Sequence, residues 1–383
     1  MAVRGFLPLQ SNFSGMRLYF CLILSVILAG FSSCKKTGQQ QPENKPLNII
    51  VMIGDGMGLS QISSLYYAGN DTPSFTFFPV VGLINTSSAS HKITDSGAGG
   101  TAFSIGERTY NGAIGVGTDS LSRKNMVEIL SAKAYLTGLV ATSSITHATP
   151  AAFYAHVRNR SMEEEIALQL IHSEIDFFAG SGIKFFNQRN DRINLFDTFP
   201  KYGFLVDTQS LKANIQYDIN KKYGFLLYAR SMPKATEKRG DFLPDATKAA
   251  IKYLSASEHG FFLMVEGSQI DWAGHDNDAD YLIAEILDFN KAIKVALDFA
   301  EKDGNTLVVV LADHETGGFS LPSSAGYEDD ESDYNSIKPT FSSKGHTASL
   351  IPVFTFGKGA ENFGGIYQNK DIFYKILQSA GLK

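Results

Sequence analysis

The sequence predicts an α/β protein, a three-layer α/β/α sandwich built on a large, mostly parallel central sheet. Two observations predict this class. Apolar runs rich in β-branched residues recur along the chain, and segments with apolar residues at helical spacing lie between them. Because the runs are almost continuously apolar, we expect strands covered on both faces, as in a parallel sheet. A chain of 383 residues with 44% hydrophobic side chains is long enough to bury such a core.

The elements can be placed along the chain in order. Strands are predicted at residues 47–53, 138–144, 260–266, 306–312 and 351–356. Helices are predicted at residues 161–172, 245–257, 280–302 and 371–381. Ser161 and Glu164 have the spacing of a capping box at the start of the first helix, and Gly381 is the expected stop of the last one.

The N-terminal segment predicts export. Residues 19–31 form an apolar run preceded by Arg17, and the run is shorter than the ~20 residues that span a bilayer. We therefore interpret residues 1–33 as an export signal. The signal ends in Phe-Ser-Ser-Cys, which resembles a bacterial lipoprotein cleavage box and predicts lipidation of Cys34. An ordinary cleaved signal, with Cys34 incidental, is the alternative.

These segments also predict the domain organisation and the location. Residues 34–46 are polar and contain Pro, so we expect the lipidated Cys and a flexible tether, followed by a single catalytic domain at residues 47–383. The protein would then be exported and either periplasmic or anchored to the outer membrane of a bacterium. The net charge of −5 argues against nucleic acid as a specific partner. Cys21 and Cys34 are the only cysteines in the sequence, which excludes a disulfide framework and a Cys-rich zinc site.

Metal-ligand residue types lie next to the predicted strands. In open α/β sheets, ligands bind beyond the carboxyl ends of the strands. The residues that end or follow predicted strands are Asp55, Glu266, Asp271, His275, Asp313 and His314, and His346 precedes the strand predicted at residues 351–356. Carboxylate and imidazole groups suit Zn²⁺ and Mg²⁺. Each residue alone is more often a turn, cap or packing residue, so the metal hypothesis rests on their coincidence.

Two further strings have the residue types of a phosphate site. Ser96 lies in TDSGAGGT, which reads as a loop entering a helix, and a helix N-terminus suits phosphate. Ser96 could be a nucleophile if a metal activates it, whereas a plain N-cap loop is the alternative. Thr149 before Pro150 predicts an N-cap with Pro at the first helical position. Arg160, about three helical turns further on, could clamp two phosphate oxygens, or it could be a surface residue.

Six strings together resemble the alkaline phosphatase family. In order from residue 53 to residue 348 they are IGDGMG, TDSGAGGTA, HATPAAFYAHVRNR, VEGSQIDWAGH, ADHETGG and GHTA. The resemblance implies hydrolysis of phosphate monoesters through a phosphoserine intermediate at a site with two Zn²⁺ and one Mg²⁺. It implies Ser96 as the nucleophile and Arg160 as the phosphate clamp.

The resemblance also implies the ligand of each metal. One zinc would be held by Asp271, His275 and His346, and a second by Asp55, Asp313 and His314. The magnesium would be held by Asp55, Thr149 and Glu266, with Asp55 bridging. The family is mostly dimeric, so a homodimer is implied as well, but the short segment between Asp313 and His346 weakens that implication.

Two positions depart from the family pattern. His147 stands where some members have Asp, so the third site would hold Zn²⁺ or a water-bridged Mg²⁺, unless His147 touches no metal. Trp272 stands near the substrate phosphate where relatives carry Lys or His, so one phosphate contact is lost, unless Trp272 serves only packing.

The sequence is compatible with three functions, of which a phosphate monoesterase is the first. A phosphodiesterase or a sulfatase of the same superfamily is the alternative to a monoesterase, and a surface protein that merely binds phosphate or metal is the third. Ser96 is followed by Gly, Ala and Gly, so the Pro and Arg of a sulfatase motif are missing. The presence of Thr149, Glu266 and Arg160 favours the monoesterase over diesterase relatives.

Overall fold

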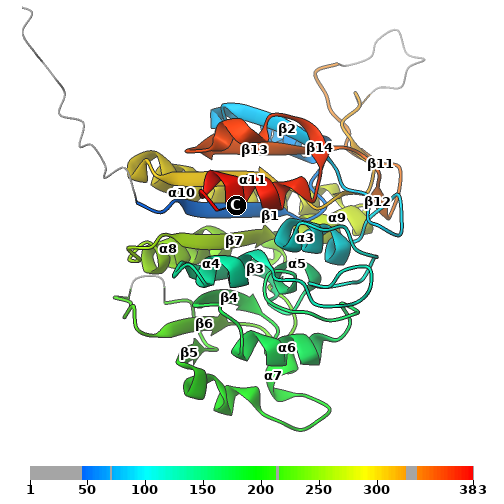
Figure 1. Ribbon diagram of the computed structural model, residues 1–383. Coiled ribbons are helices and arrows are strands. Elements are labelled where there is room, and N and C mark those ends of the chain that lie inside the picture. Colours follow the sequence, from blue (N-terminus) through cyan, green and yellow to red (C-terminus); the bar gives the residue numbers. More distant parts are fainter. Residues whose placement is uncertain (1–44, 70, 213–214, 325–333, 383) are drawn as a thin grey trace, which may run out of the picture. The chain divides into compact units, whose positions relative to one another are not determined.

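The computed structural model describes residues 45–69, 71–212, 215–324 and 334–382 (Figure 1). Residues Lys45–Lys383 group into one compact unit. The predicted export signal, Cys34 and nearly all of the tether lie outside the described residues. Within the described part of the chain, no helix is both long and apolar enough to cross a bilayer.

One large sheet organises the described residues. Its ten strands run in the order β14-β2-β13-β8-β1-β7-β3-β4-β6-β5. Their bounds are β1 Asn48–Gly54, β2 Val80–Asn85, β3 Leu136–Ser144, β4 Phe177–Ser181, β5 Phe204–Asp207, β6 Lys222–Leu226, β7 Phe261–Gly267, β8 Thr306–Leu311, β13 Ile351–Gly357 and β14 Gly365–Gln368. Neighbouring strands are parallel except where β13 pairs with β8 and with β2. The predicted α/β class with a mostly parallel sheet is therefore confirmed.

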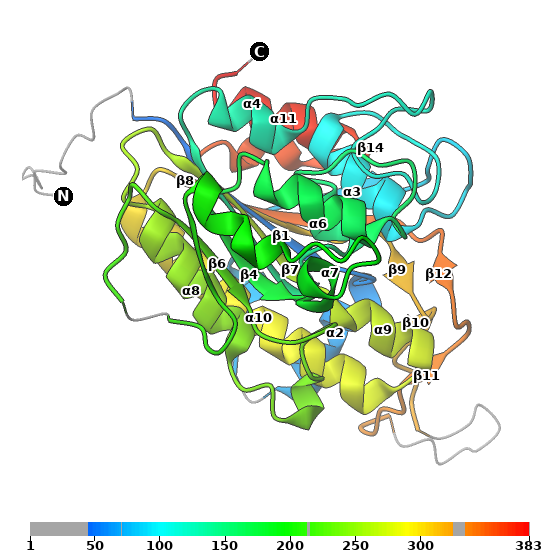
Figure 2. The same ribbon diagram turned by 90° about the horizontal axis from the view of Figure 1, so that it is seen from below.

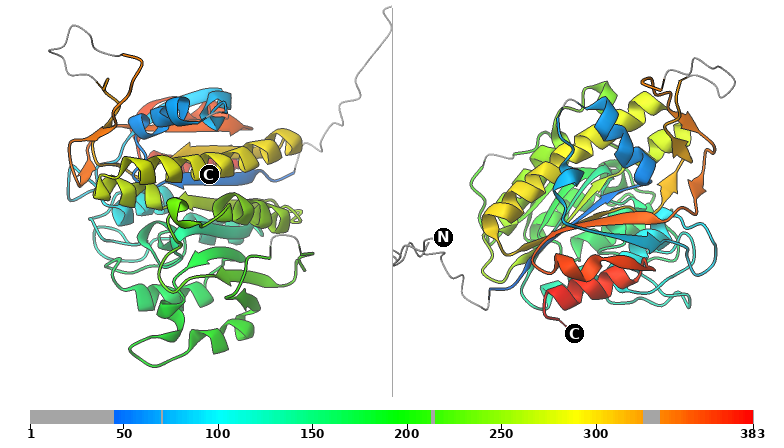
Figure 3. Two further views of the ribbon diagram at one scale, coloured as in Figure 1. Left: turned by 180° about the vertical axis from the view of Figure 1, so that it is seen from behind. Right: turned by 90° about the horizontal axis from the view of Figure 1, so that it is seen from above.

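Helices cover both faces of the sheet and complete the three-layer sandwich. Figures 2 and 3 show α2, α8 and α10 on one face, and α3, α4 and α11 on the other. The α-helices are α2 Leu59–Ala68, α3 Ser96–Ile105, α4 Met126–Ser131, α5 Ala148–Ala151, α6 Glu163–Ile171, α7 Lys184–Asn187, α8 Phe242–Leu254, α9 Gln269–Asp276, α10 Ala279–Asp303 and α11 Asp371–Ser379. Short 3₁₀ helices span Ser74–Phe77, Leu195–Asp197, Phe199–Tyr202, Ala235–Glu237 and Ala360–Phe363.

The five predicted strands correspond to β1, β3, β7, β8 and β13, and the predicted long helix at 280–302 corresponds to α10. Helix ends were harder to predict. The capping box was wrong, because α6 begins at Glu163 and the Ser161 hydroxyl bonds Asn159 instead. The predicted stop at Gly381 is confirmed, since Gly381 has φ +73° and the next amide, Leu382 N, donates back to Leu377 O at 2.8 Å.

The topology brings the predicted ligands to one edge of the sheet. Strands β8, β1, β7 and β3 are consecutive and parallel, so their carboxyl ends meet there. Because β13 runs antiparallel to β8, its start lies at the same edge. A two-residue ladder between β9 (Glu315–Thr316) and β12 (His346–Thr347) then ties the segment before β13 to the segment after β8. A second short ladder joins β10 (Phe319–Ser320) to β11 (Thr340–Phe341).

Candidate active site

Ser96 begins helix α3, as its sequence context predicts. Asp95 is the N-cap, and its carboxylate accepts a hydrogen bond from Ala98 N at 3.0 Å. Ser96 is only 2% exposed, and its Oγ lies 3.3 Å from His314 Nε2. A side chain at Gly99 would meet Asp313 Cβ at 2.9 Å, so glycine lets the first turn of α3 approach the residues after β8. The serine hydroxyl is thereby placed against a cluster of acids and histidines.

The first cluster contains Asp271, His275 and His346, whose ligand atoms lie within 4.8 Å of one another. Asp271 and His275 are one turn apart on α9, and His346 comes from β12. His275 Nδ1 bonds the Lys344 carbonyl at 2.5 Å, and His346 Nδ1 bonds the Thr94 carbonyl at 2.9 Å. Because a carbonyl only accepts, each Nδ1 carries hydrogen and each Nε2 is left free.

Those two free nitrogens face each other. His275 Nε2 and His346 Nε2 are 3.2 Å apart, and they lie 3.4 and 3.5 Å from Asp271 Oδ1. Two lone pairs and a carboxylate oxygen at this separation repel unless a cation lies among them. The donor set therefore fits a bound metal ion, as predicted for the first zinc.

The second cluster contains Asp55, Asp313 and His314, all fully buried. His314 Nε2 lies 3.5 Å from Asp55 Oδ1 and 3.4 Å from Asp313 Oδ2. These two carboxylate oxygens are buried without a hydrogen-bond donor. A buried carboxylate oxygen without a partner is costly, so this donor set also fits a cation.

The third cluster contains Asp55, Glu266 and His147, and Asp55 is thus shared with the second cluster. Glu266 Oε2 accepts from Ser268 Oγ at 2.6 Å and from Ser143 Oγ at 3.2 Å, whereas Oε1 has no donor. Thr149 Oγ1 lies 3.5 Å from Asp55 Oδ2. The predicted role of Thr149 as an N-cap was wrong, since α5 begins at Ala148 with His147 at the N-cap position.

The shifted pKa values of the buried acids also indicate that the site holds more negative charge than its own cations balance. Burial raises the pKa of Asp55 well above its usual range, and the nearby charge of Asp313 raises it further. Burial also raises the pKa of Glu266 to about 7. The hydrogen bond that a protonated His275 donates to the Asp271 carboxylate raises the pKa of His275 to about 9, so in the absence of a metal ion a proton takes the place of the cation in the first cluster. Bound metal ions would supply the charge that these groups lack.

Arg160 lies on a loop and contacts Asp95, the residue before Ser96. Its Nη1 donates to Asp95 Oδ2 at 3.1 Å, and its Nη2 lies 3.2 Å from His147 Nε2. The expected three-turn helix between Thr149 and Arg160 was wrong, because α5 ends at Ala151 and Arg160 follows in irregular structure. The Trp272 ring packs edge-on against His147, with centroids 5.9 Å apart. Burial and the charge of Arg160 lower the pKa of His147 to about 3, which keeps this ring neutral.

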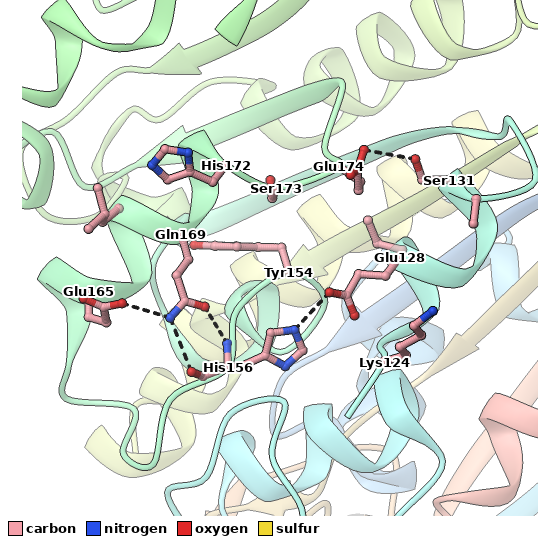
Figure 4. A pocket seen from close by; sticks show the side chains of 13 residues that line it. Lys124, Glu128, Ser131, Tyr154, His156, Glu165, Gln169, His172, Ser173 and Glu174 are labelled. Carbon is pink, nitrogen blue, oxygen red and sulfur yellow. Dashed lines mark hydrogen bonds and ion pairs between the residues drawn. The ribbon is translucent and has the colours of Figure 1, made fainter. Parts of the chain in front are cut away.

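A separate cavity lies between α4 and α6. Figure 4 shows that its side chains come from these helices and from the loop after α5, and its volume is about 580 Å³. The His156–Glu128 pair lines this cavity. Glu128, His156, Glu165 and Gln169 in its lining hydrogen-bond one another, whereas the metal-type clusters contain buried carboxylate oxygens without a donor.

Comparison with known proteins identifies the family. The alkaline phosphatase family profile matches residues 46–333. Alkaline phosphatase 4 of Bacillus subtilis is 33% identical, with 90% of this chain and 92% of the relative covered. The chain belongs to the alkaline phosphatase family. It is therefore an alkaline phosphatase, and it hydrolyses phosphate monoesters.

Other alkaline phosphatases agree with this assignment. The Escherichia coli enzyme is 30% identical over 88% of this chain and 86% of its own length. The structure of the alkaline phosphatase from the Antarctic bacterium TAB5 superposes with a TM-score of 0.84 at 50% identity, covering 88% of this chain and 99% of that one. Two TAB5 variants, in which a histidine is replaced by Asp or by Glu, are described with Mg bound in the M3 site.

Sequence reasoning missed residues that position the alkaline phosphatase site. Asp95, the residue before Ser96, accepts a hydrogen bond from Arg160, and it was not singled out from the sequence. Ser143 and Ser268 hold one oxygen of Glu266. Thr316 bonds a residue in each of two clusters. Thr316 lies inside ADHETGG, so its closeness to His314 was the one available signal.

Proposed function

We propose that this alkaline phosphatase works through a phosphoserine formed on Ser96. The observation that carries the proposal is the position of Ser96 Oγ, which is at the start of α3 and 3.3 Å from His314 in the second cluster. The free backbone N–H groups of the helix N-terminus suit the transferred phosphoryl group. Nearly complete burial of Ser96 keeps bulk water from competing with it at the phosphorus atom.

The proposed reaction transfers the phosphoryl group twice, first to Ser96 and then to water. Ser96 Oγ loses its proton and bonds phosphorus while the bond from phosphorus to the ester oxygen breaks, and the released alkoxide takes up a proton as an alcohol. Water next attacks phosphorus, the bond to Ser96 Oγ breaks, and the serine regains a proton as inorganic phosphate leaves. Arg160, which Asp95 holds, would donate two hydrogen bonds to phosphoryl oxygens in both steps, and the bond to Asp95 supports this role.

The proposed cofactors are two Zn²⁺ and one Mg²⁺. Asp271, His275 and His346 would hold one zinc, and Asp55, Asp313 and His314 the other. When bound, the metals would lower the pKa of the serine hydroxyl and of water, and would balance the charge on phosphate. The unpartnered buried oxygens of Asp55 and Asp313 support this assignment.

For the third site we propose Mg²⁺ on Asp55, Glu266 and Thr149. All three supply oxygen, which Mg²⁺ prefers. His147 Nε2 faces a guanidinium donor, so this nitrogen orients Arg160 rather than coordinating metal. Mg in the M3 site of TAB5 variants that carry Asp or Glu in place of a histidine supports a preference for oxygen at such a site.

We also propose that the enzyme is exported and anchored through lipidated Cys34, as a periplasmic or outer-membrane lipoprotein, and that it forms a homodimer. The apolar run and the Ser-Ser-Cys ending support export and anchoring. Labelling cells with a radioactive fatty acid tests the anchor, since label should be lost in a Cys34→Ser variant. Label that persists in this variant would contradict the anchor at Cys34. The proposed homodimer is tested separately, by light scattering of the purified protein.

Trapping the covalent intermediate tests the proposed mechanism. We expect acid-quenched enzyme incubated with ³²P-phosphate to carry covalent label, and Ser96→Ala to carry none while losing at least about a thousandfold in turnover of p-nitrophenyl phosphate. Ser104→Ala is a matched control, because Ser104 is buried on the same helix and bonds only Thr101 O among the contacts described. Label that survives in Ser96→Ala would place the nucleophile elsewhere.

A further inference from the structure

We propose that Thr316 is a positioning residue that couples the two zinc clusters through its hydroxyl group. This inference rests on the proposed metal assignment. Thr316 is fully buried, and its Oγ1 donates to Asp271 Oδ1 of the first cluster. The same oxygen lies 3.2 Å from His314 Nδ1 of the second cluster. One hydroxyl group therefore contacts a proposed ligand of each metal.

The direction of these two hydrogen bonds follows from the groups involved. A threonine hydroxyl has one hydrogen, and the Asp271 carboxylate can only accept it. The oxygen of Thr316 must then accept at His314, so His314 Nδ1 carries the hydrogen. In the neutral ring this leaves the lone pair on Nε2, the atom 3.3 Å from Ser96 Oγ and 3.4 Å from Asp313 Oδ2. Thr316 thereby selects the tautomer of His314 that can bind metal.

The backbone of Thr316 is held from several directions. Its N–H donates to Gly56 O at 3.0 Å, directly after Asp55. It is the ladder partner of His346 in the pair of β9 and β12. A side chain at Gly274 on α9 would meet Thr316 O at 2.9 Å, so the helix that carries Asp271 and His275 packs closely against this residue. The hydroxyl group is therefore fixed relative to the ligands of both clusters.

Removal of the hydroxyl should weaken both clusters together. Without it, His314 Nδ1–H would be buried without an acceptor, and Asp271 Oδ1 would lose its donor. Loss of a hydrogen bond to a metal-coordinating side chain commonly lowers metal affinity 10- to 100-fold. Because one group serves both clusters, we expect the affinities of the two zinc ions to fall together in a single variant.

Zinc binding to the metal-free full chain tests this proposal. Titration with zinc against a competing chelator should give two sites in the wild type, and both affinities should fall about 10- to 100-fold in Thr316→Val. Thr316→Ser keeps the hydroxyl and should restore both affinities to within about threefold. Thr247→Val is a matched control, since Thr247 is also fully buried but lies on α8 and bonds Leu243 O.

Several outcomes would overturn the proposal. Wild-type affinities in Thr316→Val, a fall at one site alone, or a failure of Thr316→Ser to restore binding would each contradict it. If Thr316→Val does not fold by circular dichroism, the same titration is made with Thr316→Ala, which also lacks the hydroxyl. Absence of zinc binding in the wild type would instead contradict the proposed function, so the two failures are distinguishable.

Discussion

At the scale of single residues, some polar atoms of the site have no hydrogen-bond partner, whereas others are held by hydrogen bonds. Asp55 and Asp313 each bury one oxygen without a donor. By contrast, His275 and His346 have each Nδ1 fixed by a carbonyl, so their Nε2 atoms can point only inward. This asymmetry is what the proposed metals explain, because a ligand atom must be free while the rest of its side chain is held.

Trp272 offers a prediction at the same scale. Its uncharged ring packs on His147, which contacts Arg160, so it lies beside the proposed phosphate clamp. We expect Trp272→Lys to tighten inhibition by inorganic phosphate about tenfold, because a charge-assisted hydrogen bond is added. Steady-state inhibition constants check this, with Trp272→Met as the uncharged control. Unchanged inhibition in the lysine variant would show that position 272 does not reach phosphate.

At the scale of elements, the His156–Glu128 pair joins α4 to the loop after α5 and lines the cavity in Figure 4. His156 Nδ1 faces Gly115 O at 2.7 Å and Nε2 faces Glu128 Oε1 at 3.2 Å, so both nitrogens can donate only when the ring is protonated. Burial lowers the pKa of His156, but these two acceptors outweigh burial and raise it overall.

The pair predicts a pH dependence of stability. Because the pKa of His156 is higher in the folded state, its stabilisation should be complete below the unfolded value near 6.5 and lost as pH rises through the folded value. We expect His156→Gln to lose up to about 1 kcal/mol of unfolding free energy at pH 6 and less at pH 9. Urea unfolding at the two pH values checks this, with exposed His172→Gln as control. An equal loss at both pH values would contradict it.

The elements also show what sequence could and could not predict. β1, β7 and β8 were predicted because they are buried on both faces and read as continuous apolar runs. β5 and β14 were not predicted from the sequence, because they lie at the edges of the sheet, are short and are partly exposed. The start of α6 was misplaced because Ser161 bonds Asn159 rather than the helix, and such a local competition is not visible in a capping pattern.

At the scale of the whole molecule, the topology explains why a site spread from residue 55 to residue 346 assembles at all. Four consecutive parallel strands have their carboxyl ends at one edge, and β13, which runs antiparallel to β8, starts at the same edge. The proposed ligand set could be read from sequence because most members follow these strands directly. Asp95, Ser268 and Thr316 could not be assigned, since their roles depend on hydrogen bonds between elements that the sequence alone does not orient.

We propose that the three clusters near Ser96 hold the metals of this alkaline phosphatase. Anomalous X-ray diffraction from crystals of the zinc- and magnesium-loaded enzyme, measured on both sides of the zinc absorption edge, tests it most directly. We predict two zinc peaks, one among Asp271, His275 and His346, and one among Asp55, Asp313 and His314. Zinc peaks away from these residues, or none at either cluster in an active crystal, would contradict the assignment.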